Sequence, residues 1–296
     1  MAGHSLEYLL KGLMNHNRDG SYAVQDGRKS ILTQAAKQLK EGGFRNMKPD
    51  SIKPKHVQFL VEKWQKDGLS SGTIKNRMSH LRWWAEKVGK SSMLPKSNSG
   101  ANNAIKLNLE KRSHIPTESK RREIDYAKLN KITDKHVQYS LKMQAAFGLR
   151  REESIKFKPS LADKGDKISL KASWCKGGRA RDIPVRTAEQ RALLNEVRAF
   201  TANGALIPGN RNYVEQLKRY ENQTAQVGMD KNHGLRHCYA QDRYQELTGW
   251  KSPIEGGIAQ KEMSKEEREI DRAARMTITE ELGHSREQIT TSYLGR

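Results

Sequence analysis

The chain has 296 residues, 35% of them hydrophobic and 30% charged, which excludes a disordered chain and leaves enough length for two domains with cores. Lysine and arginine number 55 against 34 aspartates and glutamates, a formal charge of +21, and this excess favours a polyanionic partner, first nucleic acid and second an anionic membrane. No apolar run approaches the roughly 18 residues of a membrane span, and no basic amphipathic stretch has an aromatic face, so we expect no membrane partner, no signal peptide and a cytoplasmic location.

The first 92 residues predict a compact helical domain. Apolar residues recur at helical spacing in four stretches, from 1 to about 15, 21–40, 53–66 and 74–88. The last of these carries Lys75, Arg77 and Arg82. These three cations form either a solvated helix face or a set of phosphate contacts with duplex DNA, and the charge of the whole chain favours the phosphate contacts.

Residues 93–122 predict an extended, basic linker. The stretch Ser97-Asn-Ser-Gly-Ala-Asn-Asn103 is polar and shows no periodicity. The basic residues Lys111, Arg112, Lys120, Arg121 and Arg122 lie further along the linker.

Residues 123–296 predict a second domain that is mainly α with a small β-hairpin, so the fold class is α+β. We expect helices over 125–133, 137–147, 150–157, 187–202, 214–226 and 232–247. Alternating polar and apolar residues predict strands over 167–173 and 180–185, joined by a turn at 175–179.

Residues 250–276 are unusually polar. Ser264-Lys-Glu-Glu267 has the pattern of a capping box and predicts a charged helix that runs to about Arg275. The stretch is either a solvated excursion or a contact with a partner or with DNA. Further on, Ser285-Arg-Glu-Gln288 predicts a second capping box and a short polar helix, on which Tyr293 is expected to be mobile and exposed.

Five short motifs carry the residues suited to phosphodiester chemistry. His233 and Arg236 are three positions apart, so both side chains leave one face of a helix. In chain order the motifs are Gly148-Leu-Arg150-Arg-Glu-Glu153, Lys176 followed by Arg181-Asp-Ile-Pro184, His233-Gly-Leu-Arg236-His237, Leu282-Gly-His284, and Tyr293.

These motifs resemble those of the tyrosine recombinases, the phage-integrase family: G-L-R-x-x-E, a hairpin lysine before R-x-x-P, H-x-L-R-H, L-G-H, and a tyrosine nine residues after the last histidine, as Tyr293 follows His284. The resemblance implies an N-terminal, SAM-like core-binding domain over 1–92, a linker over 93–122, and a catalytic domain over 123–296 with an insertion at about 250–276.

The resemblance further implies a site-specific DNA recombinase that forms a 3′-phosphotyrosyl intermediate on Tyr293, with His233 as base and Lys176 as general acid. Arg150, Arg236 and His284 would then stabilise the phosphate oxygens. Glu153 and His237 are expected to orient these groups, and Arg179 and Arg181 to contact DNA. No metal or other cofactor is expected.

The implied partners are double-stranded DNA at specific recombination sites, a homotetramer on two duplexes, and accessory DNA-bending or directionality factors, in the bacterial cytoplasm or nucleoid. Integration or excision of a mobile genetic element is the expected role. A dimer-resolving recombinase, a type IB topoisomerase-like enzyme and a DNA-binding regulator are the alternatives, although a regulator is expected to have lost one of the six catalytic residues.

Several of these residues also have simpler interpretations. Tyr239 and Tyr244 are rival nucleophiles, but they are expected on the rigid helix of His233. His233 and His237 have the i, i+4 spacing of zinc ligands, yet no third ligand is near in the sequence. Two cysteines, Cys175 and Cys238, form no C-x-x-C motif and are expected to be free thiols.

Overall fold

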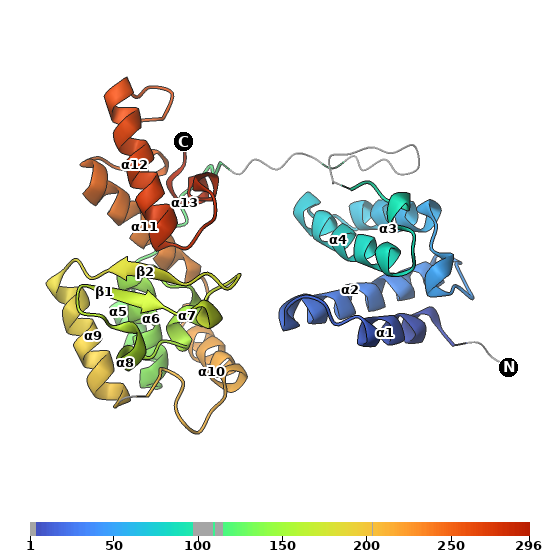
Figure 1. The fold of residues 1–296 in the computed structure, drawn as a ribbon, viewed down its shortest axis with the longest axis horizontal. Coiled ribbons are helices and arrows are strands. Elements are labelled where there is room, and N and C mark those ends of the chain that lie inside the picture. The colour runs from blue at the N-terminus through green and yellow to red at the C-terminus, as the bar shows by residue number, and fades with distance from the viewer. Residues whose placement is uncertain (1–3, 97–108, 110–114, 203) are drawn as a thin grey trace. The chain divides into compact units, whose positions relative to one another are not determined.

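The computed structural model describes residues 4–96, 109, 115–202 and 204–296 (Figure 1). Two compact units, 1–112 and 113–296, divide the chain. Helices dominate both, and the described residues contain one two-stranded antiparallel sheet, which confirms the predicted fold class. The limits of the predicted linker, 93–122, stay a prediction, because residues 97–108 and 110–114 lie outside the described part. In that part, no helix is both long and apolar enough to span a bilayer.

The first unit contains the four predicted helices. They are α1 (Leu6–His16), α2 (Tyr22–Glu41), α3 (Pro54–Lys66) and α4 (Ser71–Lys87), with 3-10 turns at Pro49–Ser51 (η1) and Ser91–Met93 (η2). Ser5, Ser21 and Ser70 accept hydrogen bonds from the first-turn amides of α1, α2 and α4, so serine capping sets three of the four starts. The apolar faces meet around Trp64 and Trp84, both almost fully buried.

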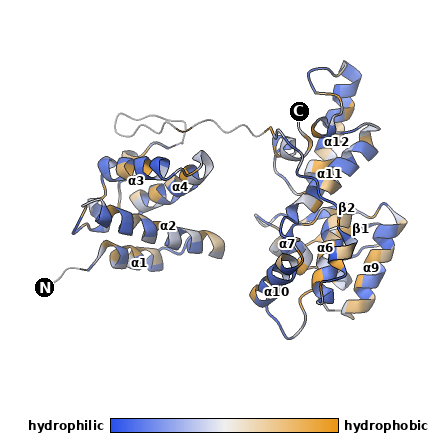
Figure 2. Cartoon of the chain, turned by 180° about the vertical axis from the view of Figure 1, so that it is seen from behind, coloured by the Kyte–Doolittle hydropathy of each residue, from blue (hydrophilic) through white to orange (hydrophobic). Residues whose placement is uncertain are grey.

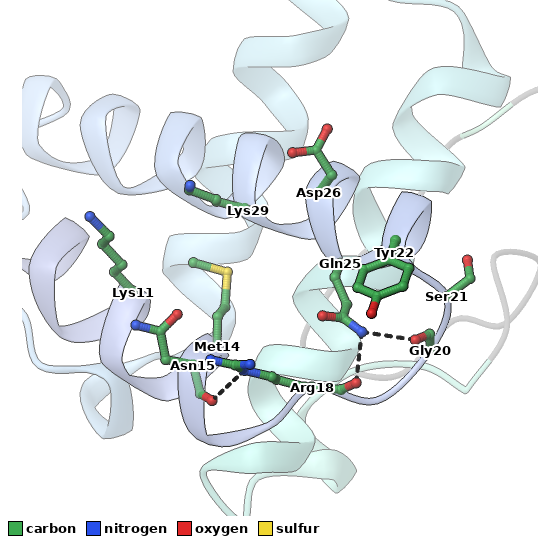
Figure 3. A pocket seen from close by; sticks show the side chains of 10 residues that line it. All are labelled: Lys11, Met14, Asn15, Arg18, Gly20, Ser21, Tyr22, Gln25, Asp26 and Lys29. Atoms are coloured by element: carbon green, nitrogen blue, oxygen red, sulfur yellow. Dashed lines mark hydrogen bonds between the residues drawn. The ribbon is translucent and has the colours of Figure 1, made fainter. Parts of the chain in front are cut away.

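The corner between α1 and α2 encloses a hollow of about 620 Å³ (Figure 3). The Gln25 amide donates to the carbonyl oxygens of Arg18 at 2.8 Å and Gly20 at 2.9 Å, which closes the turn between the two helices. None of the predicted catalytic or DNA-binding side chains lines this hollow.

The second unit is larger and holds the sheet. Its helices are α5 (Tyr126–Leu129), α6 (Lys135–Phe147), α7 (Arg151–Ile155), α8 (Pro159–Ala162), α9 (Ala188–Thr201), α10 (Tyr213–Gln226), α11 (His233–Thr248), α12 (Lys265–Glu281) and α13 (Thr291–Leu294). Three 3-10 turns lie at Ala172–Trp174 (η3), Pro253–Glu255 (η4) and Glu287–Ile289 (η5). Figure 2 shows hydrophilic and hydrophobic residues interleaved along the labelled helices, as helices with one buried face require.

Strands β1 (Lys167–Leu170) and β2 (Arg181–Pro184) form the antiparallel hairpin, with Lys167 opposite Pro184 and Leu170 opposite Arg181. The expected first strand, 167–173, is shorter because η3 replaces its last residues. Ile168 and Ile183 are fully buried and pack into a core that also contains Phe147 of α6 and Tyr239 of α11. The hairpin, whose turn carries Lys176, is therefore packed on the same core as α11.

Of the two alternatives for the 250–276 stretch, a purely solvated excursion does not fit, because its helix buries one face, and contact with a partner or with DNA stays a prediction. Helix α12 begins at Lys265 after the predicted Ser264 capping box, but it runs on to Glu281 and buries one face. In that face Arg275 Nε donates to Asp271 at 2.8 Å, and the hydroxyl of Tyr244 in α11 donates to the same carboxylate at 2.6 Å. This buried pair of α12 thus ties the helix to α11, while the exposed face of the helix keeps its other charged residues in contact with solvent.

Candidate active site

Arg236 lies at the centre of the predicted site and is only 1% exposed. Its guanidinium donates to the carbonyl oxygens of Gly148 and Leu282 and lies 3.3 Å from Nε2 of His284. Gly148 follows α6 with a left-handed φ of 60°, and Leu282 caps α12, so both acceptors are carbonyls that helix ends leave unpaired. Burial lowers the pKa of Arg236 to about 10, which leaves it charged at neutral pH.

The Tyr293 hydroxyl reaches this arginine. It lies 3.3 Å from Arg236 Nε and 3.5 Å from Nε2 of His233. The phenol ring packs against the rings of His237 and His284, with centroids 4.5 and 5.4 Å away. Three imidazoles and a guanidinium, contributed by α11 and by the segment after α12, therefore surround one tyrosine.

The expectation of a mobile, exposed Tyr293 was wrong, since the residue is 6% exposed. The predicted capping box at 285–288 is also absent, and the segment instead forms η5 followed by the four-residue helix α13. The Gln241 amide donates to the Tyr293 carbonyl at 2.9 Å, and the hydroxyls of Thr279 and Thr290 lie 2.6 Å apart. These bonds attach α13 to α11 and α12, which fixes the tyrosine.

Arg150 is held from behind by Glu153. The carboxylate of Glu153 is fully buried and accepts from the backbone N of Arg150 at 2.7 Å and from its Nη1 at 2.8 Å. It also accepts from Nη1 and Nη2 of Arg181 at 2.9 and 2.7 Å. Although burial opposes ionisation, the hydrogen bonds and charge of Arg181 lower the pKa of Glu153 to about 2. Glu153 thus remains ionised and bridges two arginines.

Arg181 was expected to contact DNA, a call that stays a prediction, and the structure directs its side chain into the protein. Its side chain is 6% exposed, forks onto Glu153, and donates through Nε to the carbonyl oxygen of Glu281 at 2.7 Å. The guanidinium is therefore directed into the protein, where it supports the carboxylate that holds Arg150. Arg179, two residues earlier in the hairpin turn, is exposed.

The histidines of the site are held in their neutral forms. Burial, together with the charge of Arg236, lowers the pKa of His284 to about 3. Burial and the neighbouring His233 lower the pKa of His237 to about 4. Burial also lowers the pKa of His233, with further contributions from Arg236, Arg150 and Lys120. A neutral His233 can accept a proton, and a neutral His284 can donate one hydrogen bond.

Lys176 stands apart from this cluster. It lies in the exposed turn between η3 and β2, where Gly177 and Gly178 adopt left-handed φ angles of 77° and 67°. Its side chain is exposed, and among the described residues no hydrogen bond or ion pair holds it. The structure therefore brings five of the six predicted catalytic residues together and leaves the sixth on the hairpin turn.

The three cations of α4 are partly engaged within the first unit. The Arg77 guanidinium lies over the Trp64 ring, 5.0 Å from its centroid. Arg82 Nε donates to the carbonyl oxygen of Pro95 at 2.7 Å. Lys75 is half-buried. Their contact with DNA stays a prediction.

Sequence reasoning missed residues 119–122, which lie on the start of α11. The backbone N of Arg122 donates to the carbonyl oxygen of Gly234 at 3.1 Å, and Ser119 Oγ accepts from the Gln241 amide at 3.1 Å. A Cβ at Gly234 would lie 2.5 Å from Arg122 Cγ, so only glycine permits this approach. No periodicity marks the segment, which the sequence therefore places in the predicted linker, 93–122.

Two family models match the chain. One describes the N-terminal part of phage integrases and matches residues 4–94, and the other describes integrases and matches residues 109–242. A search of curated proteins found no match.

Solved structures share the fold at low sequence identity. A XerH site-specific recombinase bound to a palindromic difH substrate is 17% identical, with 98% of this chain and 81% of that chain covered and a TM-score of 0.60. A lambda integrase dimer bound to a COC′ core site is 13% identical and has a TM-score of 0.61. The match covers 98% of this chain and 95% of that chain. The Tn1549 transposon integrase in complex with circular intermediate DNA is 14% identical and has a TM-score of 0.52. The match covers 99% of this chain and 96% of that chain.

Proposed function

The chain belongs to the phage-integrase family of tyrosine recombinases, and we propose that it cleaves and rejoins DNA at specific sites through a covalent link to Tyr293. One observation carries the proposal. The Tyr293 oxygen lies between a buried guanidinium, Arg236, and a neutral imidazole, His233. A phenol that acts as a nucleophile needs a base to accept its proton and a cation to stabilise the negative charge on its oxygen. His233 and Arg236 can supply these two functions.

In the proposed cleavage step, Tyr293 Oη attacks a backbone phosphorus and passes its proton to Nε2 of His233. A bond forms between Oη and phosphorus, and the bond from phosphorus to the 5′-oxygen breaks. Lys176 protonates the departing 5′-oxygen, which requires the exposed hairpin turn to approach the DNA. The products are a 3′-phosphotyrosyl link and a free 5′-hydroxyl, and attack by another 5′-hydroxyl reverses the step.

Stabilisation of the phosphate is assigned to Arg150, Arg236 and His284. Negative charge grows on the two non-bridging oxygens during the attack, and donors fixed in advance lower the barrier because they need not reorganise. Arg236 is fixed by two carbonyl oxygens and Arg150 by Glu153. Because the bond energy is kept in the phosphotyrosyl ester, the chemistry needs no external energy source.

The biological role proposed is integration or excision of a mobile genetic element, carried out by a homotetramer on two duplexes. A transposon integrase is among the structural relatives, and another relative is a lambda integrase tetramer bound to a Holliday junction. The positive charge of +21 supports a DNA partner.

Covalent trapping tests the reaction. The protein is incubated with nicked duplexes that span candidate attachment sites, and denaturing electrophoresis followed by mass spectrometry locates any nucleotide on the protein. We expect an adduct on Tyr293 that Tyr293→Phe cannot form.

Tyr239→Phe is the matched control. The Tyr239 hydroxyl donates to Glu281 at 2.7 Å and the Tyr244 hydroxyl to Asp271 at 2.6 Å, so carboxylates already hold both rival nucleophiles. The control variant should still form the adduct. An adduct that persists in Tyr293→Phe would refute the assignment, and binding without any adduct would favour a regulator.

A further inference from the structure

Three consecutive cations, Lys120, Arg121 and Arg122, lie beside the start of α11 and differ in their partners. Arg121 donates to Asp242 at 2.5 Å and to Glu123 at 2.8 Å, so two carboxylates neutralise it. Lys120 is exposed, and within the described part of the chain it has no hydrogen bond or ion pair. Arg121 is therefore neutralised, whereas Lys120 and Arg122 are exposed and retain unbalanced charges among the described residues.

The backbone fixes Lys120 against the first turn of α11. Its carbonyl oxygen lies 2.7 Å from the position that a Cβ on Gly234 would take, and Gly234 directly follows His233. Arg122, two residues further on, is bonded to the Gly234 carbonyl. The Lys120 charge reaches the active site, since it contributes to the lowered pKa values of both His233 and His237.

Three carboxylates around this edge of the site are already committed, whereas Glu118, which precedes Lys120 by two residues, is exposed. Glu153 is shared by Arg150 and Arg181, and Asp242 and Glu123 are taken by Arg121. Arg236 is buried and charged with no carboxylate in contact among the described residues. The edge at His233 thus holds more positive than negative charge, and an anion placed there would reduce the repulsion.

We propose that Lys120 binds a phosphate of the DNA strand next to the phosphate that Tyr293 attacks, on the side of His233. The inference rests on the proposed function. It adds a DNA contact made by residue 120, which lies in the predicted linker, 93–122. A lysine suits this role because its compact ammonium can bind a phosphate oxygen without a fixed angle of approach.

Salt-dependent binding tests the contact. Affinity for a random-sequence duplex is measured at several salt concentrations in the Tyr293→Phe background, where cleavage does not interfere. The slope of log K against log salt concentration is negative, and loss of one phosphate contact reduces its magnitude by about one. We expect this decrease for Lys120→Gln, the parental slope for Lys120→Arg, and the parental slope for Arg121→Gln, the control from the paired cation. An unchanged slope in Lys120→Gln, or an equal decrease in Arg121→Gln, would overturn the proposal.

The pH profile of adduct formation tests whether Lys120 acts beside His233. It is measured in chains that keep Tyr293. Removing a cation near His233 raises the pKa of that base, so Lys120→Gln should move the acidic limb of the profile to higher pH. A decreased slope with an unmoved acidic limb would place the contact elsewhere on the DNA and refute the assignment. If the parent protein forms no adduct, the proposed function fails, whereas the salt slopes still decide whether Lys120 binds phosphate.

Discussion

Nε of Arg236 donates to the hydroxyl of Tyr293 at 3.3 Å, although 57 positions separate the two residues. The same guanidinium also bonds to Gly148 and Leu282, the carbonyls that end α6 and α12. One buried side chain therefore joins the nucleophile to two helix ends, and its orientation is determined by backbone groups. Such a group is fixed before substrate arrives, which is the condition for efficient electrostatic stabilisation.

Replacing Arg236 with lysine should impair both cleavage and stability. A single ammonium cannot donate to two separated carbonyls and to the phenol at once, so buried acceptors lose their partners. We expect cleavage to fall on the order of 10²–10³-fold and the free energy of unfolding to fall by about 1–3 kcal/mol. Single-turnover cleavage and urea denaturation measure the two effects. Arg243→Lys, in the same helix but bonded to Glu281, should lose stability while cleavage is kept.

Neutralising Glu153 should release both arginines that it holds. In Glu153→Gln the buried Arg181, 6% exposed, keeps its charge without a counterion, which typically costs about 3–5 kcal/mol of stability. Arg150 loses its support, so cleavage should fall as well. The control is Asp182→Asn, which breaks the exposed pair with Lys167 and should cost at most about 1 kcal/mol. Equal losses in the two variants would show that the buried bridge has no special role.

Motif order and helical periodicity were enough to predict most of this arrangement. The amphipathic stretches became α2, α3, α4, α6, α9, α10 and α11, because repeated apolar positions and capping residues act locally. The spacing of His233 and Arg236 was sufficient to place them on one helix. Their approach to Tyr293 depends on tertiary packing, and the family resemblance, not the spacing, indicated it.

The failures also have physical reasons. A helix of four residues such as α13 has no measurable period, so nothing local showed that Tyr293 packs among three imidazoles. The charged i, i+4 pair of Asp271 and Arg275 is typical of a solvated helix, yet the hydroxyl of Tyr244 gives the pair a buried partner. The direction of Arg181 was likewise set by Glu153, 28 positions away.

The close packing of the chain after α13 against η4 predicts that a substitution at Gly295 slows adduct formation. This residue has a φ of 73°, and a Cβ there would lie 2.9 Å from the backbone N of Ile254 in η4. Gly295→Ala should displace α13 and move Tyr293 away from His233. We expect at least about tenfold slower adduct formation, equivalent to about 1.4 kcal/mol of barrier, and faster hydrogen exchange over 287–296.

Gly249→Ala is the matched control for this effect. Gly249 has a similar φ of 83°, but a Cβ there would meet no atom within 4 Å. Both variants introduce backbone strain, and only Gly295→Ala adds the clash with η4. If adduct formation slows equally in the two variants, strain alone explains the loss, and the contact with Ile254 does not position the tyrosine.

Stability should fall as the solution is acidified, and the buried histidines are the reason. The pKa values of His284 and His237 are about 3 and about 4 in the folded chain, against an ordinary value of 6.5. Between pH 6.5 and 4 the unfolded chain therefore binds more protons than the folded chain, so the free energy of unfolding decreases as pH falls. Above pH 6.5 both states are neutral at these rings and the contribution is constant. Urea denaturation across this range should give a steeper pH dependence for the parent than for the double variant His237→Gln with His284→Gln. Parallel curves would mean that these rings become protonated in the folded chain as readily as in the unfolded chain.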